Sequence, residues 1–196
     1  MKEILNIEFE PFAQHEIIMK TDRIHLRHWR HDDAEALFRY ASDPEVGPRA
    51  GWQPHSSVEE SRLIIESVFN NATTWAIALN DTDEAIGAIG YGESCDCALP
   101  ALPGEQTVGY WVAKPYWNQG ICTEALRLLV DYCFDGEGMQ SLISGHFVDN
   151  PTSGRVMEKC GFVATGEIAF DPTLYGGADH PIRVLRITRS KTPDAL

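Results

Sequence analysis

The chain has 196 residues, of which 43% are hydrophobic and 23% charged, and this composition suits one globular domain with a substantial core. Its formal net charge of −13 argues against nucleic acid as the ligand, because contacts to phosphate backbones need clustered Lys and Arg. The acidic balance favours cationic partners such as amines, polyamines or basic protein tails, or it serves only for solubility.

Targeting and metal signals are missing from the sequence. No apolar run has the length of a membrane span, and the N-terminus lacks the layout of a signal peptide. The five cysteines show no metal-ligand spacing, and scattered cysteines without an export signal are typical of a reducing compartment. We therefore expect a cytoplasmic protein that binds neither a membrane nor a metal, with its cysteines as small buried apolar residues.

A strand and two helices are predicted in the first third of the chain. Ile24–Trp29 alternates in the manner of a strand, and Asp32 or Asp33 then caps a helix that continues through Tyr40. Ser57–Glu60 has the form of a capping box, which opens a second helix. We expect the apolar side of this second helix to consist of Leu63, Ile64 and Val68.

A β-hairpin is predicted next. Thr74–Leu79 and Ala85–Tyr91 have strand composition, and Asn80–Asp83 between them has the composition of a turn. Residues Glu93–Gly104 show no periodicity and predict an inserted loop. Val108–Val112 is predicted to be the following strand.

The rest of the chain predicts two helices and three strands. A polar loop at Asn118–Gly120 leads into a helix, Leu142–Val148 is a strand, and a further helix begins at Asn150-Pro151, where proline suits the first helical position. That helix ends near Gly161, and two strands follow, over Glu167–Phe170 and Arg183–Thr188.

These elements together predict a mixed α/β sheet. Only the strand–helix–strand unit over Val108–Val148 must contain parallel strands, because a helix joins the two strands of that unit. The order of elements is neither that of a doubly wound sheet nor that of a barrel.

The loop before the helix at residue 121 carries the first chemical signal. The N–H groups at a helix N-terminus lack intrahelical partners and suit a phosphate, and Gly120 has no Cβ to obstruct the approach. One glycine before a helix is also compatible with a purely structural loop. The common nucleotide-binding glycine motifs are absent from the sequence.

Five segments extend this signal to a known family, and the last two, VGYWVAKPYWNQGICTEAL and NPTSGRVMEKCGF, are the specific ones. The three that precede them are TDRIHLRHWRHDDAEAL, SDPEV and GWQPHSSVEES. With these segments the chain resembles the GNAT superfamily of acetyl-CoA-dependent N-acetyltransferases, in particular its RimJ/RimL-like branch. The resemblance implies a single α/β domain over 1–196, with a core at about 21–188, an N-terminal extension and a short C-terminal tail. It also implies a splayed sheet that holds the cofactor in the splay.

The resemblance assigns the cofactor contacts. The pyrophosphate loop of the family falls on Trp117–Cys122, where Trp117 and Gly120 agree with the family and Asn118 and Cys122 replace small residues. The family implies that the end of the preceding strand pairs with the pantetheine arm, and that Asn150 and Ser153 lie near the pantetheine and the thioester sulfur. The implied acetyl-CoA contacts are Trp111, Val112, Ala113, Trp117, Asn118, Gln119, Gly120, Ile121, Cys122, Thr123, Asn150 and Ser153.

The catalytic residues are less well determined by the family pattern. Met157 stands where many members have a tyrosine that protonates the leaving thiolate, so Ser153 is the expected acid. Thr107 stands where relatives often have a glutamate, which leaves Glu105 or Glu93 to act as the base through a water, or as surface carboxylates. His146 faces the site or belongs to the core, and we expect Tyr91 and Tyr110 to form pocket walls.

The expected activity is transfer of an acetyl group from acetyl-CoA to a primary amine by direct attack. The acceptor is a protein N-terminal α-amine, for example of a basic protein, or a small amine; its identity would be set by Ala50–Pro54, Glu93–Glu105 and Asp171–Pro181. The missing tyrosine and glutamate favour one alternative, a catalytically silent CoA-binding sensor or scaffold. An unrelated α/β nucleotide-binding protein is another, and a homodimer is left open.

Overall fold

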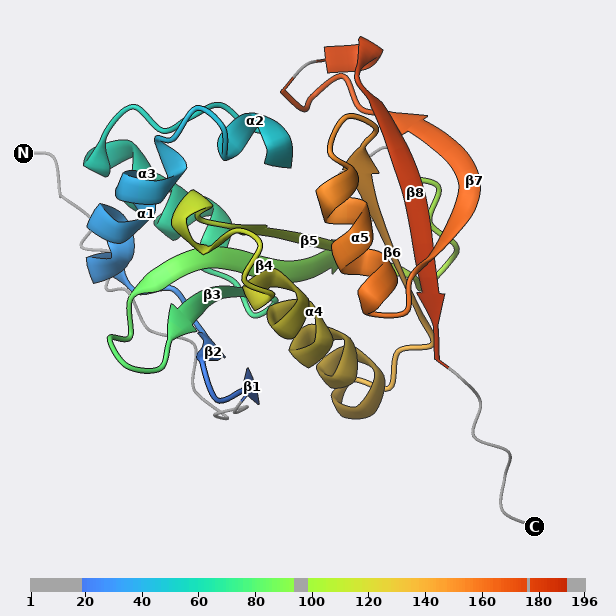
Figure 1. Ribbon diagram of the computed structural model, residues 1–196, viewed down its shortest axis with the longest axis horizontal. Helices are drawn as coiled ribbons and strands as arrows, with labels where there is room; N and C mark the ends of the chain where they lie inside the picture. Colours follow the sequence, from blue (N-terminus) through green and yellow to red (C-terminus); the bar gives the residue numbers. More distant parts are fainter. Residues whose placement is uncertain (1–18, 94–98, 176, 190–196) are drawn as a thin grey trace, which may run out of the picture.

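The computed structural model describes residues 19–93, 99–175 and 177–189, and within them the strands form one eight-stranded mixed sheet (Figure 1). The sheet order is β1-β2-β3-β4-β5-β6-β8-β7, and every neighbouring pair is antiparallel except β5 and β6. The predicted α/β class, and the single parallel pair, are therefore confirmed. The strands are β1 (Met19–Lys20), β2 (Ile24–Arg27), β3 (Thr74–Leu79), β4 (Ala85–Glu93), β5 (Gln106–Val112), β6 (Ser141–Phe147), β7 (Val163–Phe170) and β8 (Pro181–Thr188).

Helices cover both faces of the sheet. One face carries α1 (Ala34–Ala41), α2 (Gly47–Ala50) and α3 (Val58–Ile64), and the other carries α4 (Ile121–Asp131) and α5 (Pro151–Lys159) (Figure 1). The remaining turns are η1 (His31–Asp33), η2 (Ile65–Phe69), η4 (Lys114–Tyr116), η5 (Tyr132–Gly136) and η6 (Gly177–Asp179). Among the described residues, no helix combines the length and the hydropathy that crossing a bilayer requires.

The alternation of side chains along β3 and β4 builds two cores. Ile77 and Ile89 are fully buried in the same hydrophobic cluster as Leu126 and Leu129 of α4. On the opposite face, small residues such as Ala88 let the α1 and α3 helices lie close to the sheet. The central strands are therefore buried on both faces, which fixes their register.

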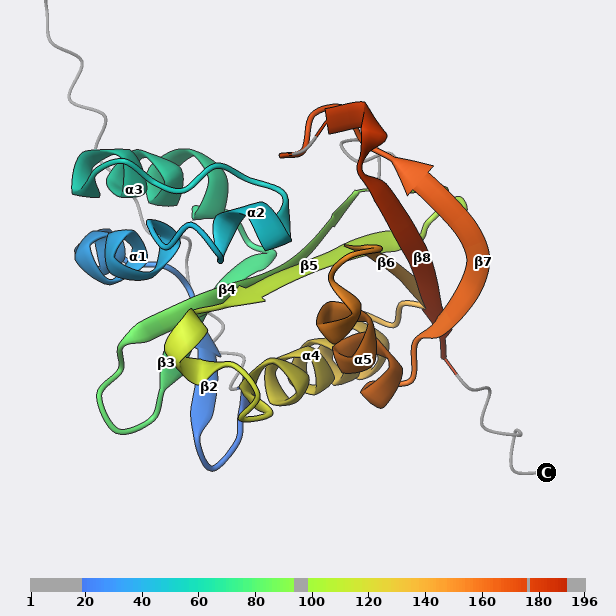
Figure 2. The same cartoon turned by 45° about the horizontal axis from the view of Figure 1, so that its top comes forward.

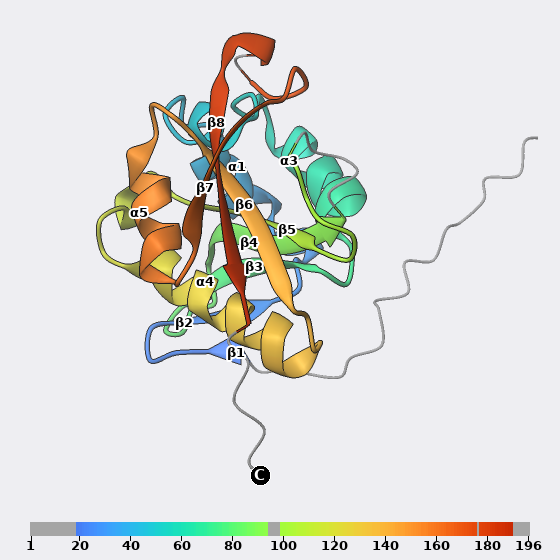
Figure 3. The same cartoon turned by 90° about the vertical axis from the view of Figure 1, so that its right-hand side faces the viewer.

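The sheet opens between β5 and β6. These strands pair only at Gln106 with Leu142 and at Thr107 with Ile143. Beyond this point β6, β8 and β7 turn away from the direction of β4 and β5 (Figures 2 and 3). The backbone of β5 thereby loses its neighbour on one edge, and the space between the strands opens toward the N-termini of α4 and α5.

The second helix differs from its prediction. Leu63 and Val68 are 62% and 52% exposed, so they do not form its buried side. The buried positions are Ser61 and Ile65, and from Ile65 the helix has π geometry, which changes the residues that share a face. Ile64 packs at the edge of the cluster, as expected.

The cap of this helix is half of the predicted capping box. The Ser57 hydroxyl accepts a hydrogen bond from the Glu60 N–H at 3.0 Å, as predicted. The Glu60 carboxylate, however, accepts from the N–H and the hydroxyl of Ser56, one residue before the expected partner.

Candidate functional site

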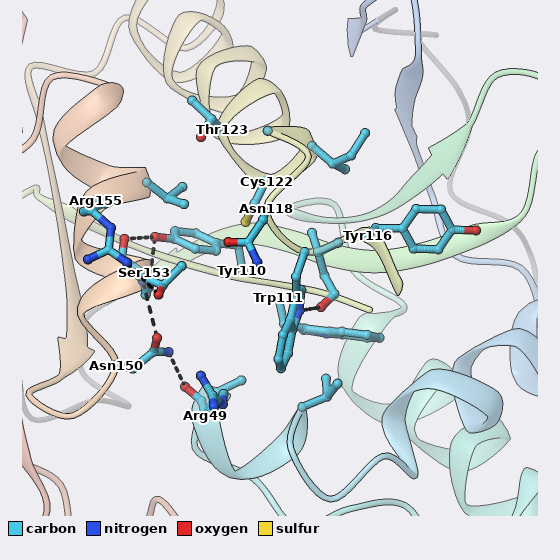
Figure 4. Close-up of a pocket in the computed structure, with 18 of the residues that line it drawn as sticks. Arg49, Tyr110, Trp111, Tyr116, Asn118, Cys122, Thr123, Asn150, Ser153 and Arg155 are labelled. Carbon is cyan, nitrogen blue, oxygen red and sulfur yellow. Dashed lines mark hydrogen bonds between the residues drawn. The ribbon is translucent and has the colours of Figure 1, made fainter. Parts of the chain in front are cut away.

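A cavity of about 410 Å³ lies beside the end of β5, between α4 and α5, and we call it the splay cavity (Figure 4). Its walls come from β5, the short helix α2, the loop after η4, the first turn of α4 and the helix α5. Of the residues expected to contact the cofactor, those that line it are Trp111, Val112, Trp117, Asn118, Gly120, Ile121, Cys122, Thr123, Asn150 and Ser153. Ala113 and Gln119 are not part of this lining: Ala113 is buried, and Gln119 is exposed, with its amide donating to the Pro115 carbonyl at 2.7 Å.

The loop that precedes α4 has a backbone conformation that can surround an anion. Asn118 and Gly120 adopt left-handed backbone angles, with φ of 59° and 81°. A Cβ on Gly120 would come no closer than 3.6 Å to another group, so its glycine is required by conformation rather than by lack of space. This turn leads directly into α4, and the N–H groups of its first turn therefore have no intrahelical partners.

Side chains from distant elements hold the loop in place. The Arg23 guanidinium donates to the Gln119 carbonyl at 3.0 Å and to the Glu124 carboxylate. The Trp117 indole donates to the Val112 carbonyl at 2.7 Å, and the Arg49 guanidinium lies 5.1 Å from the centre of the Trp117 ring. The loop is thus fixed before any ligand binds.

The edge of β5 is only partly available for pairing. The Ala113 N–H donates to the Ile86 carbonyl of β4, so alternation directs the backbone groups of residues 108, 110 and 112 toward the splay cavity. The Val108 carbonyl accepts from the Ser144 hydroxyl, and the Trp117 indole occupies the Val112 carbonyl. The open part of the strand edge is therefore at Tyr110.

Two hydroxyl groups meet at the inner end of the splay cavity. The Tyr110 hydroxyl lies 3.1 Å from the Ser153 hydroxyl and 3.0 Å from the Ser153 carbonyl (Figure 4). Asn150 caps α5 by accepting from the Ser153 N–H, and its amide donates to the Arg49 carbonyl at 3.3 Å. Burial raises the pKa of Tyr110 well above its usual range, so its hydroxyl stays protonated at neutral pH.

Three cations and a thiol complete the lining. Arg49, Arg155 and Lys159 line the splay cavity, and the sequence analysis missed them. The four-residue spacing of Arg155 and Lys159 predicts that both side chains lie on one face of the same helix. Arg49, in contrast, reaches the cavity from the separate short helix α2. Burial raises the pKa of the Cys122 thiol, which makes it a poor nucleophile.

The expected bases are not brought to this cavity. Glu105 is buried just before β5, where its carboxylate accepts from the Arg186 guanidinium at 2.7 Å and from the Leu102 N–H at 2.9 Å. This ion pair holds the Glu105 side chain outside the splay cavity. Strand alternation predicted that Glu105 and Thr107 share a face, but sharing that face does not bring Glu105 into the site. Glu93 ends β4, and its side chain lies outside the described residues.

His146 and Met157 lie beside the hydroxyl pair. His146 lines a smaller cavity, of about 120 Å³, together with Tyr110 and Ser153, and its Nδ1 lies 2.8 Å from the Phe147 carbonyl. Met157 is buried in the main core, which confirms that no tyrosine hydroxyl stands there.

A further cavity, of about 580 Å³, lies on the opposite face of β5, and we call it the far cavity. Its walls come from β4, β5 and the helices α1 and α3, and they include Trp52, His55 and Tyr91. Tyr110 and Trp111 line both the splay cavity and the far cavity. The two spaces therefore meet at one segment of β5.

Within the described residues no cluster of three or more His, Cys, Asp or Glu side chains could hold a metal ion. The chemical groups of the site are a helix N-terminus, three cations, two hydroxyls and the open edge of a strand. These groups suit a ligand with several phosphates and an extended polar arm.

Comparisons with known proteins agree with this site. The family description "Acetyltransferase (GNAT) domain" matches residues 23–163. Over 154 residues the chain is 30% identical to Uncharacterized N-acetyltransferase YoaA of Bacillus subtilis (strain 168), which covers 76% of this chain and 84% of that protein. A shorter match, 29% identical over 84 residues, is to the ribosomal-protein-serine acetyltransferase of Escherichia coli (strain K12), and it covers 43% of this chain and 44% of that protein.

Solved structures show the same fold. Mycobacterium smegmatis RimJ in complex with CoA-disulfide has a TM-score of 0.69 and 20% sequence identity, and the match covers 90% of this chain and 91% of that one. Members of the matched family use acetyl-CoA as the acetyl donor. The chain belongs to the GNAT family of acetyltransferases, as its motifs predicted.

Proposed function

We propose that this acetyltransferase binds acetyl-CoA in the splay cavity and transfers the acetyl group to a primary amine that approaches from the far cavity. The observation that carries the proposal is the meeting of the two cavities at Tyr110 and Trp111, beside the Ser153 hydroxyl. Direct attack needs both substrates at one point, and this segment of β5 is where both can be present.

The phosphates of the donor belong at the mouth of the splay cavity. The N–H groups of the first turn of α4 and the left-handed turn at Gly120 suit the pyrophosphate. Arg49, Arg155 and Lys159 supply positive charge within the same lining. The pantetheine arm then runs toward Tyr110, whose backbone offers the open edge of β5.

The reaction moves one proton to the amine's base and one to the leaving sulfur. The amine nitrogen attacks the thioester carbon, the carbonyl oxygen takes the negative charge, and the C–S bond breaks as the oxyanion collapses. Ser153 donates its hydroxyl proton to the thiolate, and the second proton that the nitrogen loses as the amide forms returns to Ser153 through water. The Tyr110 hydroxyl donates to the Ser153 carbonyl, and its oxygen lies 3.1 Å from the Ser153 hydroxyl, so Tyr110 positions Ser153 at the inner end of the cavity.

Among the described residues, His55 is the group placed to take the proton of the incoming ammonium. His55 lines the far cavity, and its Nδ1 lies 2.8 Å from the Ser61 hydroxyl. Burial lowers the pKa of His55, against the attraction of Glu60, and keeps its imidazole neutral at pH 7. The alternative is Glu93, which follows the cavity-lining residue Gly92 on β4.

The acceptor is an amine rather than an alcohol or a thiol. A related acetyltransferase carries the name of a ribosomal-protein-serine acetyltransferase, which supports a protein N-terminus as one class of acceptor. A small amine is the other class that the geometry admits.

A thiol-release assay tests the proposal. The protein is mixed with acetyl-CoA and a panel of primary amines and short peptides, free thiol is followed, and CoA binding is measured separately by calorimetry. We expect amine-dependent release. Tight CoA binding without release above hydrolysis, across the whole panel, would contradict the proposal and favour a CoA-binding sensor.

A further inference from the structure

The residues that line the far cavity restrict the kind of amine that it can bind. Its side walls are aromatic and aliphatic, with the Trp52 and Trp111 rings 5.6 Å apart in an edge-on arrangement. No Asp, Glu, Lys or Arg is found among the described residues that line it. The volume, about 580 Å³, is that of a small-molecule site.

The floor of the far cavity is made of glycine backbone. Gly90 and Gly92 of β4 face Gly109 and Thr107 of β5 in the register of the two strands. A Cβ on Gly87 or Gly90 would approach a carbonyl oxygen to 2.3 or 2.6 Å, so packing requires those two glycines. A Cβ on Gly92 or Gly109 would meet no atom of the described residues within 4 Å.

Packing therefore does not account for Gly92 and Gly109. Glycine inside a strand weakens it and leaves nothing to pack, and here the result is open space next to the site. The space begins where the two cavities share Tyr110 and Trp111. A ligand that holds its amine at this point must place its remaining atoms over the glycine floor, between Trp52 and Phe69.

Charge decides which ligand fits there. A second ammonium, as in a polyamine or a lysine side chain, would lose its hydration in the far cavity without gaining a carboxylate among the described residues that line it. An apolar group, in contrast, replaces water against aromatic walls at a gain that grows with its area. None of the acidic residues behind the net charge of −13 is among the described residues of this lining.

We propose that the acceptor is a primary amine with a bulky apolar group, aromatic or branched aliphatic, on the carbon next to the amine. This inference rests on the proposed function, because it names the acceptor of that same site. Two kinds of molecule carry such an amine: a free amino-acid-like amine, and a peptide through its N-terminal residue.

The first test compares acceptors on the wild-type protein. We expect kcat/KM for phenylalaninamide and leucinamide to exceed that for glycinamide by roughly tenfold to a hundredfold. Spermidine should be the poorest acceptor. Equal or better turnover of glycinamide or spermidine would overturn the proposal. Peptides that begin with Phe or Gly, run beside the amides, show which of the two sources is preferred.

Binding is measured in the same samples, so the inference is tested even without turnover. With CoA present, phenylalaninamide should quench the tryptophan fluorescence at lower concentration than glycinamide does. If amines bind with this preference but no thiol is released, the proposed function fails and the inference stands. If thiol is released without any preference for apolar amines, only the inference fails.

The second test fills the open space above the glycine backbone of the far cavity with a larger side chain. Gly92→Val places two methyl groups in the open space, and a β-branched residue suits a strand, so the variant should fold. We expect the ratio of kcat/KM for phenylalaninamide to that for glycinamide to fall at least tenfold. Ala164→Val, on the exposed face of β7 away from the cavities, also introduces a valine into a strand and serves as the control. An unchanged ratio in the folded Gly92→Val protein would overturn the proposal.

Discussion

At Ser153 the serine hydroxyl and the tyrosine hydroxyl form one unit. Met157 occupies the position where many family members carry their acid, and a different tyrosine, Tyr110 of β5, reaches the same region from the strand side. From the sequence, Tyr110 is predicted only as part of a pocket wall, because strand alternation gives the face of a residue but not the partner of its hydroxyl. A shifted pKa and a hydrogen bond to the proposed acid give it a more specific role.

The pair predicts a characteristic pattern of kinetics. Ser153→Ala should lower kcat about a hundredfold, in the range of lost general acid catalysis, and leave the KM for acetyl-CoA within about threefold. Tyr110→Phe should lower kcat less, and the double variant should be no slower than Ser153→Ala alone, because the two groups act in series. Steady-state kinetics measure this, and effects that multiply would show that the residues act separately.

The two candidate bases make different predictions for pH. If His55 takes the proton, kcat at saturating acceptor should fall as the pH drops below 6.5, because the buried imidazole must remain neutral and its pKa is lowered. His55→Gln should then remove this acidic limb, while Glu93→Gln keeps it. The reverse pattern, with turnover lost in Glu93→Gln and the limb kept in His55→Gln, would assign the base to Glu93.

At the scale of elements, an ion network joins β2 to the β3–β4 hairpin. Asp83 sits at the hairpin turn with φ of 59°, and its carboxylate accepts from Arg27 at 2.8 Å and also from Arg30. Partial burial of Asp83 opposes its ionisation, but these hydrogen bonds outweigh it and lower the pKa of Asp83 to about 2. Arg27 also binds Asp33, which precedes α1, so the network ties the helix to the sheet.

This network makes stability depend on pH in a defined window. Because the folded pKa is below the ordinary value of about 3.9, the contribution of Asp83 is present above pH 4 and is lost as the pH falls toward 2. Asp83→Asn keeps the left-handed turn and should lower the melting temperature at pH 7 by about 2–4 °C, with the difference vanishing near pH 2. Asp135→Asn, in an exposed pair with Arg189, is the control and should change little.

Local patterns predicted most elements, and long-range contacts account for the failures. The strand–loop–helix around Gly120 was predictable because its glycine and its helix start are neighbours in the sequence. The exposure of Leu63 was not, since it depends on how α3 rests on α1 and where π geometry begins. The strand β7 begins at Val163 rather than at the predicted Glu167, because pairing with β8 continues there around a bulge.

At the scale of the whole molecule, the sheet consists of two parts joined by a short ladder. β5 and β6 share only two registered pairs, and the splay cavity lies where they separate. Motifs predicted the cofactor loop, but the partner of Glu105 is Arg186, which is remote in sequence. Such a pair leaves no local signal, so the sequence could not show that this carboxylate is occupied.

A ligand that touches both parts of the sheet should stabilise the entire domain. Residues from β5 and α4 on one side and from α5 on the other line the same cavity. At a concentration about a thousand times its Kd, CoA should raise the melting temperature by roughly 10 °C. ATP and NAD, which share the phosphates but not the pantetheine arm, should raise it less in the same thermal scan; equal protection would argue for a general nucleotide site.

The four-residue helix α2 reaches both substrates at once. Arg49 lines the splay cavity and lies over Trp117, whereas Gly47 lies directly under the Trp52 ring, which lines the far cavity. If the donor and the acceptor bind in these two cavities as we propose, a donor that orders this helix through Arg49 would also fix Trp52 for the acceptor. By reciprocity, we then expect each substrate to tighten the binding of the other, so that formation of the ternary complex is cooperative.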